Sequence, residues 1–294
     1  MFIMTLKRQN EKQKGLLYGL LGAAMYATYI LTDKYVYKHY AVNNFSYAVT
    51  FTIWAGIFAL GAMLINRYKK EFHVFNKGTV SVGLNGMLAG VGIAFIVYGQ
   101  QYTTAINASI IATTSILTTV VYSRFMLKET LNRFQALCLF VMFFGLYIAI
   151  VGFSSISLNK GDVIILCSSI ILGFTNTFSK ILMRDNSSDY VADFRLVAGG
   201  VLFLFLGLAF KGSSFFITTA GLWPVLAGLC YWLTIKFFYA SIHYSNPNKA
   251  IVLINSHPII TPIVGVLVLS EPYSVSKFIG SLLILTGVYF INKK

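Results

Sequence analysis

Residues 102–129 read YTTAINASIIATTSILTTVVYSRFMLKE, and residues 244–271 read YSNPNKAIVLINSHPIITPIVGVLVLSE. The two stretches align without a gap at an offset of 142 residues and carry identical residues at Tyr102/Tyr244, Ala108/Ala250, Thr119/Thr261, Leu127/Leu269 and Glu129/Glu271. Self-similarity at about half the chain length indicates a duplicated unit. We therefore predict two repeats, at residues 1–155 and 156–294.

The composition places both repeats in a membrane. Of the 294 residues 57% are apolar and 11% are charged, and the mean hydropathy is +0.73. A soluble protein of this size has too little interior for so many apolar side chains, whereas a bilayer accepts them on the outer surface. The apolar runs are continuous rather than alternating, which predicts an all-α integral membrane protein. Windows of about 20 apolar residues predict ten transmembrane helices, at residues 16–36, 45–66, 79–100, 103–124, 133–153, 161–183, 191–210, 219–242, 246–269 and 275–291.

Lysine and arginine set the expected orientation. With the N-terminus in the cytoplasm, 17 of the 23 Lys and Arg residues fall on the inner side, Arg195 among them, five fall outside, and Lys236 falls within a span. Cationic residues prefer cytoplasmic loops, so we expect a multi-pass protein of the cell membrane with both termini cytoplasmic. Because each repeat holds five spans, an odd number, the second repeat is inverted. Inverted repeats are typical of alternating-access carriers, whose substrate site lies near the midplane between the halves.

The sequence disfavours several other functions. A net charge of +14 would suggest nucleic-acid binding in a soluble protein, but here the loops on one membrane face account for it. The three cysteines and four histidines show no metal-ligand spacing, and the chain has no G-x-x-x-x-G-K-[ST] phosphate loop. Its nine acidic residues leave no paired carboxylates within a predicted span. We therefore expect no metal, no cofactor, no nucleic acid partner and no enzymatic activity.

Several short motifs, in their order and doubling, resemble a known family. Ala27–Lys34 has an echo in Gly173–Lys180, Phe194-Arg195 opens the seventh span, and Leu127-Lys128-Glu129 parallels Leu269-Ser270-Glu271. This pattern resembles the EamA repeats of the drug/metabolite transporter superfamily, and the likeness covers nearly the whole chain. The resemblance implies a ten-helix, inverted-repeat carrier that moves small metabolites, often amino acids or related compounds, and frequently outward.

Lys236 is the first candidate for substrate binding. An ammonium several residues inside a span is costly unless it is paired or hydrated. Trp232 lies four residues before it and Tyr239 three residues after it, so the three side chains share one helix stripe. One interpretation is a cation that binds a substrate carboxylate between aromatic walls. The other is a lysine that extends toward the inner headgroups.

The ninth span holds a second group of candidates. Asn255 and His257 precede Pro258, and Pro262 follows one turn later. Proline removes a backbone hydrogen bond and blocks the carbonyl four residues back, so both prolines are expected to bend this helix at a site or hinge. His257 is either a hydrogen-bonded packing residue or a titrating group that couples transport to protons.

The remaining candidates are amides, aromatics and two glutamates. Buried amides need a partner, water or a ligand, and aromatic side chains deep in a span can line a cavity. Glu129 and Glu271 end the fourth and ninth spans, where each is expected to accept hydrogen bonds from the first turn of the next helix or to act as a gate. The substrate-binding set is completed by Tyr26, Tyr29, Trp54, Asn85, Tyr98, Asn107 and Asn176.

These observations favour a secondary transporter that moves a small polar metabolite, in particular an amino acid or related amine, and most simply exports it. Two alternatives stay open: an integral-membrane enzyme, and a channel or scaffold without alternating access. The expected partners are a small-molecule substrate, the lipid bilayer and, as a candidate coupling ion, protons. The sequence accommodates a monomer or a homodimer.

Overall fold

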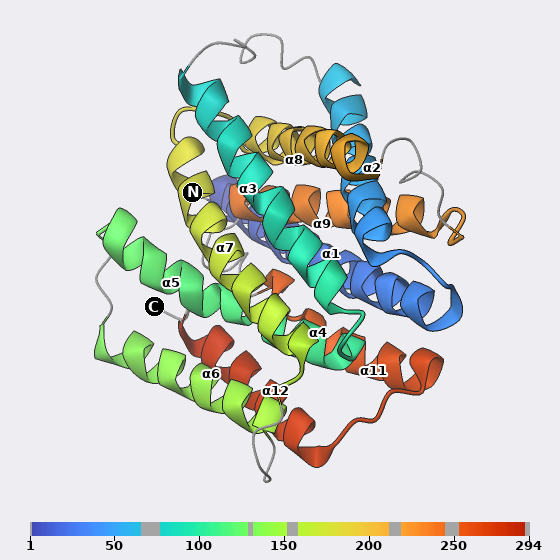
Figure 1. Ribbon diagram of the computed structural model, residues 1–294. Helices are drawn as coiled ribbons and strands as arrows, with labels where there is room; N and C mark the ends of the chain where they lie inside the picture. The colour runs from blue at the N-terminus through green and yellow to red at the C-terminus, as the bar shows by residue number, and fades with distance from the viewer. Residues whose placement is uncertain are drawn as a thin grey trace.

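The computed structural model describes residues 2–65, 77–128, 132–151, 158–211, 219–244 and 253–291, and these residues contain helices and no strand. The arrangement of the helices is shown in Figure 1. In chain order they are α1 (Phe2–His39), α2 (Asn44–Ile65), α3 (Lys77–Gly99), α4 (Ala105–Ala112), α5 (Thr114–Met126), α6 (Arg133–Val151), α7 (Lys160–Leu182), α8 (Ser188–Lys211), α9 (Trp223–Tyr244), α11 (His257–Leu269) and α12 (Val275–Ile291).

The prediction of an all-helical membrane protein is confirmed for the part of the chain that the structure describes. Six helical stretches are long and apolar enough to cross a membrane, and they are Gln13–His39, Asn44–Ile65, Gly78–Gly99, Ala105–Met126, Lys160–Leu182 and Ser188–Phe210. The other four predicted spans correspond to α6, α9, α11 and α12. Ten crossings, and the inversion of one half relative to the other, stay predictions.

The predicted fourth span is interrupted near its middle. Thr113 separates α4 from α5, and its hydroxyl donates a hydrogen bond of 2.6 Å to the carbonyl of Ile110. The hydroxyl of Thr114 donates likewise, at 2.7 Å, to the carbonyl of Ile111. Threonine hydroxyls that bond to carbonyls of the preceding turn compete with the helix ladder and bend helices. The break therefore forms without a proline.

The ninth span is interrupted at the equivalent point. Asn255 and the residue after it form a turn, and α11 begins at His257. Pro258 therefore does not bend a helix from within, as the sequence suggested; it lies in the first helical turn, where its missing N–H costs no hydrogen bond. Pro262 does lie inside α11. Thr113 and Asn255 are 142 residues apart, the offset of the predicted repeats, so the two breaks lie at the same position of each predicted repeat.

Contacts between helices are reciprocal between the two predicted repeats. α1 packs along α9 as α3 packs along α7, and α2 packs on α9 as α3 packs on α8. α2 packs on α8, the helix that corresponds to it in the second predicted repeat. α6 likewise packs on its counterpart α12, and these two helices lie side by side at one edge of the bundle (Figure 1). Exchanging the first five predicted spans for the second five converts each of the first two contacts into its partner and leaves α2 with α8 and α6 with α12 unchanged.

Glycines let α8 approach its neighbours closely. A Cβ on Gly56 of α2 would lie 3.2 Å from the Cα of Gly200, and one on Gly90 of α3 would lie 3.0 Å from the Cα of Gly199. Small residues at such crossings allow membrane helices to pack by backbone contact. The helix that carries Arg195 is thus held between α2 and α3.

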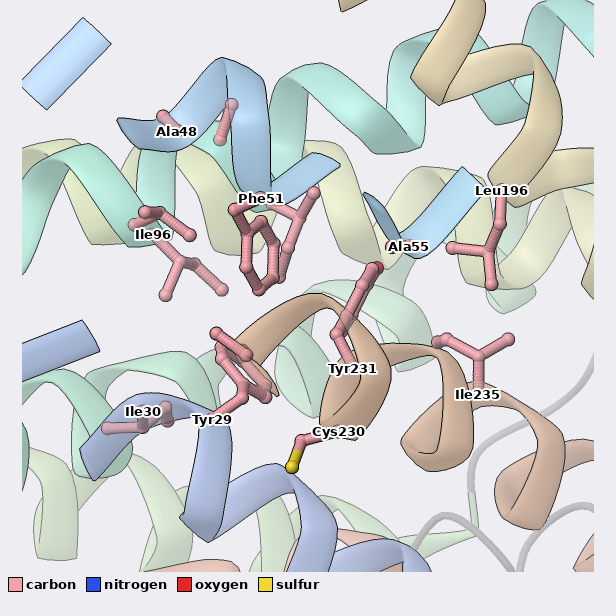
Figure 2. Packing of buried hydrophobic residues seen from close by; sticks show 14 of the residues in the cluster. Tyr29, Ile30, Ala48, Phe51, Ala55, Ile96, Leu196, Cys230, Tyr231 and Ile235 are labelled. Atoms are coloured by element: carbon pink, nitrogen blue, oxygen red, sulfur yellow. The ribbon is translucent and has the colours of Figure 1, made fainter. Parts of the chain in front are cut away.

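Aromatic rings fill the centre of the main core. Tyr29 of α1 lies edge-on to Tyr231 of α9, with ring centroids 5.5 Å apart, and Phe51 of α2 contacts both rings (Figure 2). All three side chains are buried. The core therefore joins helices of both predicted repeats rather than forming separately in each.

Candidate functional site

A small cavity of about 70 Å³ lies among the helices, with room for a few water molecules. Residues beside both helix breaks line it, namely Ser115 and Thr119 after the break in the fourth span and Asn255 at the break in the ninth. Arg195 is the only charged side chain among the described lining residues. The full lining comprises Tyr26, Ile93, Ser115, Ile116, Thr119, Leu172, Asn176, Arg195, Tyr231, Thr234, Ile235, Phe238, Ile254 and Asn255.

Arg195 lies two turns inside α8 and is only 2% exposed. The sequence counted it among the cations of the inner side, at the opening of a span expected to begin at residue 191; α8 begins earlier, at Ser188, and the side chain is buried among residues of α7 and α9. A charge inside an apolar helix marks a functional position by default. Arg195 could have been found from its depth within the helix. A span that starts at residue 191 places it only one turn from the helix end, so its depth was underestimated.

Among the described residues, the groups that accept hydrogen bonds from the guanidinium of Arg195 are uncharged. Its Nη1 donates to Asn176 Oδ1 at 3.3 Å, Ser179 Oγ at 3.4 Å and the Tyr239 hydroxyl at 3.3 Å, and its Nη2 donates to Thr175 Oγ1 at 3.3 Å. Its Nε has no hydrogen-bond partner among the described residues. Within that part of the chain Arg195 also forms no ion pair. A buried cation without a countercharge is the strongest electrostatic feature of the cavity.

Two predicted residues hold this arginine in place. Asn176 accepts from it directly and lines the cavity. Asn85 of α3 donates to the Thr175 carbonyl at 3.3 Å and to Ser179 Oγ at 2.9 Å, so it contacts two residues that also bond to Arg195. Asn85 does not line the cavity itself.

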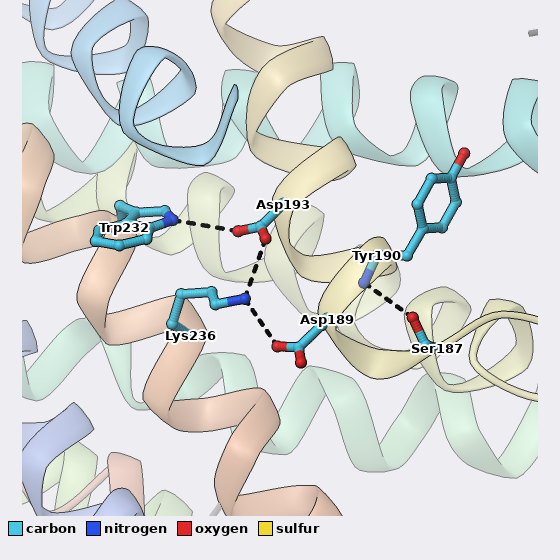
Figure 3. Close-up of polar contacts among 6 residues, drawn as sticks. All are labelled: Ser187, Asp189, Tyr190, Asp193, Trp232 and Lys236. Atoms are coloured by element: carbon cyan, nitrogen blue, oxygen red, sulfur yellow. Dashed lines mark hydrogen bonds and ion pairs between the residues drawn. The ribbon is translucent and has the colours of Figure 1, made fainter. Parts of the chain in front are cut away.

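Lys236 has two carboxylate partners on α8. Its Nζ lies 2.7 Å from Asp189 Oδ1 and 3.0 Å from Asp193 Oδ2, as Figure 3 shows. Trp232 donates from Nε1 to the other oxygen of Asp193 at 3.2 Å. The charge of Lys236 is therefore paired in this conformation, whereas its predicted substrate role and its predicted extension toward the headgroups stay predictions.

The two aspartates correct a second expectation. Asp189 and Asp193 lie four residues apart on α8, so one helix does hold paired carboxylates; the predicted span began after Asp189 and missed the pair. The Asp193 side chain is fully buried, whereas that of Asp189 is 53% exposed. Trp232, Lys236 and Tyr239, which were predicted to share one stripe of a helix, contact two different charged residues. Trp232 and Lys236 donate hydrogen bonds to Asp193, whereas the hydroxyl of Tyr239 accepts one from Arg195.

His257 packs beneath the cavity wall. Its ring stacks on Tyr26 with centroids 4.0 Å apart, and its Nδ1 shares a hydrogen bond of 2.7 Å with Ser109 Oγ. The side chain is 1% exposed, and among the described residues Nε2 has no hydrogen-bond partner. This geometry matches the packing interpretation of His257, while its role in proton coupling stays a prediction.

The structure separates several other predicted residues from the cavity. Tyr29 lies in the aromatic core, one turn from Tyr26, and Trp54 packs against Phe58 with ring centroids 6.1 Å apart. The Tyr98 hydroxyl lies 3.4 Å from that of Tyr102 at the end of α3. The backbone N–H of Asn107 donates to Thr104 Oγ1 at the start of α4. None of these predicted residues lines the cavity.

A polar network joins the helices at one end of the bundle, which we call the capped end. Buried Asp33 accepts from the Tyr47 hydroxyl at 2.8 Å and from Gln100 Nε2 at 3.2 Å. Lys34 Nζ donates to the carbonyls of Gln100 and Thr103, at 3.1 and 2.6 Å. These contacts tie the end of α1 to the starts of α2 and α4 and to the end of α3.

Three further contacts at the capped end connect the two predicted repeats. Thr103 Oγ1 donates to Asp162 Oδ1 at 2.6 Å, and Lys38 Nζ donates to the Leu269 carbonyl at 2.6 Å. Glu271 accepts from the N–H groups of Ala105 and Ile106, at 2.7 and 3.0 Å. The glutamate was expected to bond to the helix that follows it. It caps α4 instead, because the packing of α11 on α4 brings that helix N-terminus to its carboxylate. Glu129 lies outside the described residues.

Comparisons with known proteins also indicate a membrane transporter. The EamA-like transporter family model matches residues 13–151 and 159–293. The chain is similar to the uncharacterized transporter YyaM of Bacillus subtilis (strain 168), with 24% identity over 281 residues that cover 92% of this chain and 90% of the relative. It is also similar to an uncharacterized transporter of Archaeoglobus fulgidus, 21% identical over 264 residues that cover 86% and 88% of the two chains. A crystal structure of a protein 16% identical in sequence shares the fold, with a TM-score of 0.65 over 95% of this chain and 98% of that one.

Proposed function

The chain belongs to the EamA-like transporter family, and on that premise we propose that it moves a small polar metabolite, such as an amino acid or related compound, by alternating access between two inverted repeats. Family membership and the names of its relatives make it a multi-pass membrane transporter rather than an enzyme. The cargo, the direction and the alternating-access cycle are the parts that we infer.

The position of the cavity carries this proposal. It lies where the broken helix of the first half, at Ser115 and Thr119, meets the broken helix of the second half, at Asn255. In transporters with inverted repeats, discontinuous helices form the substrate site at the interface of the repeats. The reciprocal packing of α1 on α9 and α3 on α7 supports the same symmetry.

The capped end supports a two-state cycle. It is closed by contacts between the halves, including those of Lys38 with Leu269 and of Glu271 with Ala105. The cavity lies nearer the other end: Asn176 is 16 residues beyond the start of α7 at the capped end, whereas Arg195 lies two turns from the opposite end of α8. In the alternating state these contacts would open and the cavity would close toward the far end.

The direction follows from the expected topology. With both termini in the cytoplasm, the capped end faces outward and the cavity lies nearer the cytoplasm. A carrier in this state loads its cargo from inside the cell, which favours export. Uptake into inside-out vesicles and its absence from right-side-out vesicles would support this direction; the reverse pattern would contradict it.

Counterflow in proteoliposomes tests the carrier itself. Vesicles preloaded with unlabelled substrate should accumulate labelled substrate transiently, with saturable kinetics, because a carrier exchanges one molecule for another across a single site. A channel would give linear flux without accumulation. The same vesicles, under an imposed pH gradient, test protons as the coupling ion: uphill accumulation in the native protein and its loss in His257→Gln would support a coupling role for this histidine.

A further inference from the structure

The hydrogen bonds of Arg195 do not use all of the N–H groups of its guanidinium. Nη1 has three acceptors within reach and Nη2 has one, whereas Nε has none among the described residues. A guanidinium carries five N–H groups in one plane. The N–H of Nε and the second N–H of Nη2 therefore lack protein partners in that part of the chain. Nε and Nη2 share one edge of the guanidinium plane, and N–H groups along that edge match the two oxygens of a carboxylate.

We propose that Arg195 binds the carboxylate of the cargo through this edge, and that the cargo is a small organic acid with an apolar or aromatic body. This inference rests on the proposed transport function, because it assigns a substrate class to the same cavity. It assigns to Arg195 the carboxylate-binding role that one interpretation of the sequence proposed for Lys236.

The charges around α8 support this assignment. Lys236 already has Asp189 and Asp193 as partners, at 2.7 and 3.0 Å. The direct partners of Arg195 are an amide and hydroxyl groups. A buried charge that lacks a countercharge is costly, and an anionic ligand supplies that countercharge. A neutral or cationic ligand does not.

The rest of the lining describes the body of the ligand. Tyr26, Tyr231 and Phe238 give the cavity aromatic walls, and no carboxylate is present among the described lining residues to bind an ammonium group. Aromatic walls favour a flat or apolar body. A carboxylate is thus recognised by charge, whereas an amino group is not.

Matched ligands test the proposal on the full chain in detergent. The first ligand is 3-phenylpropanoate, the second is the neutral amide 3-phenylpropanamide, which has nearly the same shape, and the third is the cation 2-phenylethylamine. Binding to the folded state raises the unfolding temperature with the logarithm of ligand concentration. We expect a concentration-dependent rise for the acid, and little or none for the amide and the amine.

Variants assign the discrimination to Arg195. Arg195→Gln should weaken acid binding by about 10- to 100-fold, the loss of charge-assisted hydrogen bonds, and should remove the preference for acid over amide. Arg195→Lys keeps the charge but loses the two-pronged geometry, so it should bind the acid more weakly than the native chain. Arg184→Gln, the same change at an exposed arginine after α7, is the matched control and should bind as the native chain does.

Three results would overturn the inference. The first is equal shifts with acid and amide in the native chain, a comparison that needs no variant to fold. The second is an Arg195→Gln protein, monodisperse on gel filtration, that keeps the preference. The third is an equal shift with chloride or inorganic phosphate, which would mean a general anion site. Counterflow separates this failure from failure of the transport function: exchange of neutral or cationic metabolites but not of acids would contradict only the substrate class, and absence of exchange with every ligand would contradict the carrier.

Discussion

Gly86 of α3 lies directly against the backbone of Arg195 on α8: a Cβ on Gly86 would stand 2.7 Å from the Arg195 Cα and 2.9 Å from its carbonyl carbon. Backbone atoms cannot turn aside as a flexible side chain can, so any side chain at this position must push the two helices apart. Because residue 86 has no side chain, α3 and α8 can approach closely enough to hold Arg195 in its observed position.

Gly86→Ala should destabilise the protein and displace Arg195. Overpacking of a close helix contact costs about 1–3 kcal/mol, and we expect a lower unfolding temperature in detergent together with weaker acid binding. Gly61→Ala, in α2, is the control, since a Cβ there would meet nothing within 4 Å. That variant should be as stable as the native chain, or slightly more so, because alanine favours the helix. Equal effects of the two changes would contradict the contact.

Lys236→Met should be strongly destabilising. It leaves the buried carboxylate of Asp193 with only the Trp232 N–H as a described partner, and breaking a buried ion pair typically costs about 3–5 kcal/mol. Asp193→Asn should cost more than Asp189→Asn, because exposed ion pairs contribute about 1 kcal/mol or less. Chemical denaturation of the three purified variants measures these differences.

A double variant separates the ion pair from general packing. Lys236→Met with Asp193→Asn removes both charges, so the pair should lose less stability than the sum of the two single changes. Simple additivity would show that Lys236 and Asp193 do not stabilise each other.

Glu271→Ala should loosen the capped end. The carboxylate accepts two backbone hydrogen bonds at the start of α4, and its loss should cost roughly 2–3 kcal/mol. Glu271→Gln keeps one acceptor oxygen and should fall between alanine and the native residue. Asp185→Asn, which removes a negative charge at an exposed turn, should leave the unfolding temperature unchanged. If the alanine variant were as stable as the native chain, the cap would contribute nothing.

Pro262→Ala should slow exchange without abolishing binding. Alanine restores an N–H that can bond to the Pro258 carbonyl, so α11 becomes straighter and stiffer. Counterflow rate and ligand affinity, measured on the same preparation, separate the two effects. Pro272→Ala, in the exposed connection before α12, is the control and should exchange at the native rate. Unchanged counterflow in Pro262→Ala would argue against a hinge within α11.

Topology reporters test the inversion directly. A tag inserted after residue 155 and a tag at the C-terminus should lie on opposite sides of the membrane, because five crossings separate them. The N-terminus should lie on the same side as the C-terminus. The accessibility of the tags in intact cells and in lysed cells measures their location. If the tag after residue 155 and the C-terminal tag lie on the same side, the repeats are not inverted.

The lining of the cavity was predicted only in part from local sequence patterns. Tyr26 and Asn176 were predicted from their depth within apolar runs and Asn255 from its place beside Pro258, and all three line it. Pro258 predicted a bend within the ninth span, whereas the structure has a break just before it and α11 begins at His257. The break at Thr113 carries no proline and was missed, because threonine disturbs a helix only when its hydroxyl bonds to a backbone carbonyl.

The sequence by itself determined the all-helical membrane character and the family, because hydropathy and motif spacing can be read along the chain without knowing which helices pack together. Only the tertiary structure decided which charge is free. Arg195 and Lys236 look alike in the sequence, as single cations near apolar segments, but Lys236 pairs with Asp189 and Asp193, whereas the described partners of Arg195 are all neutral. That difference arises where α8 packs between α3 and α9, and electrostatic pairing depends on distances across helices that the order of residues does not contain.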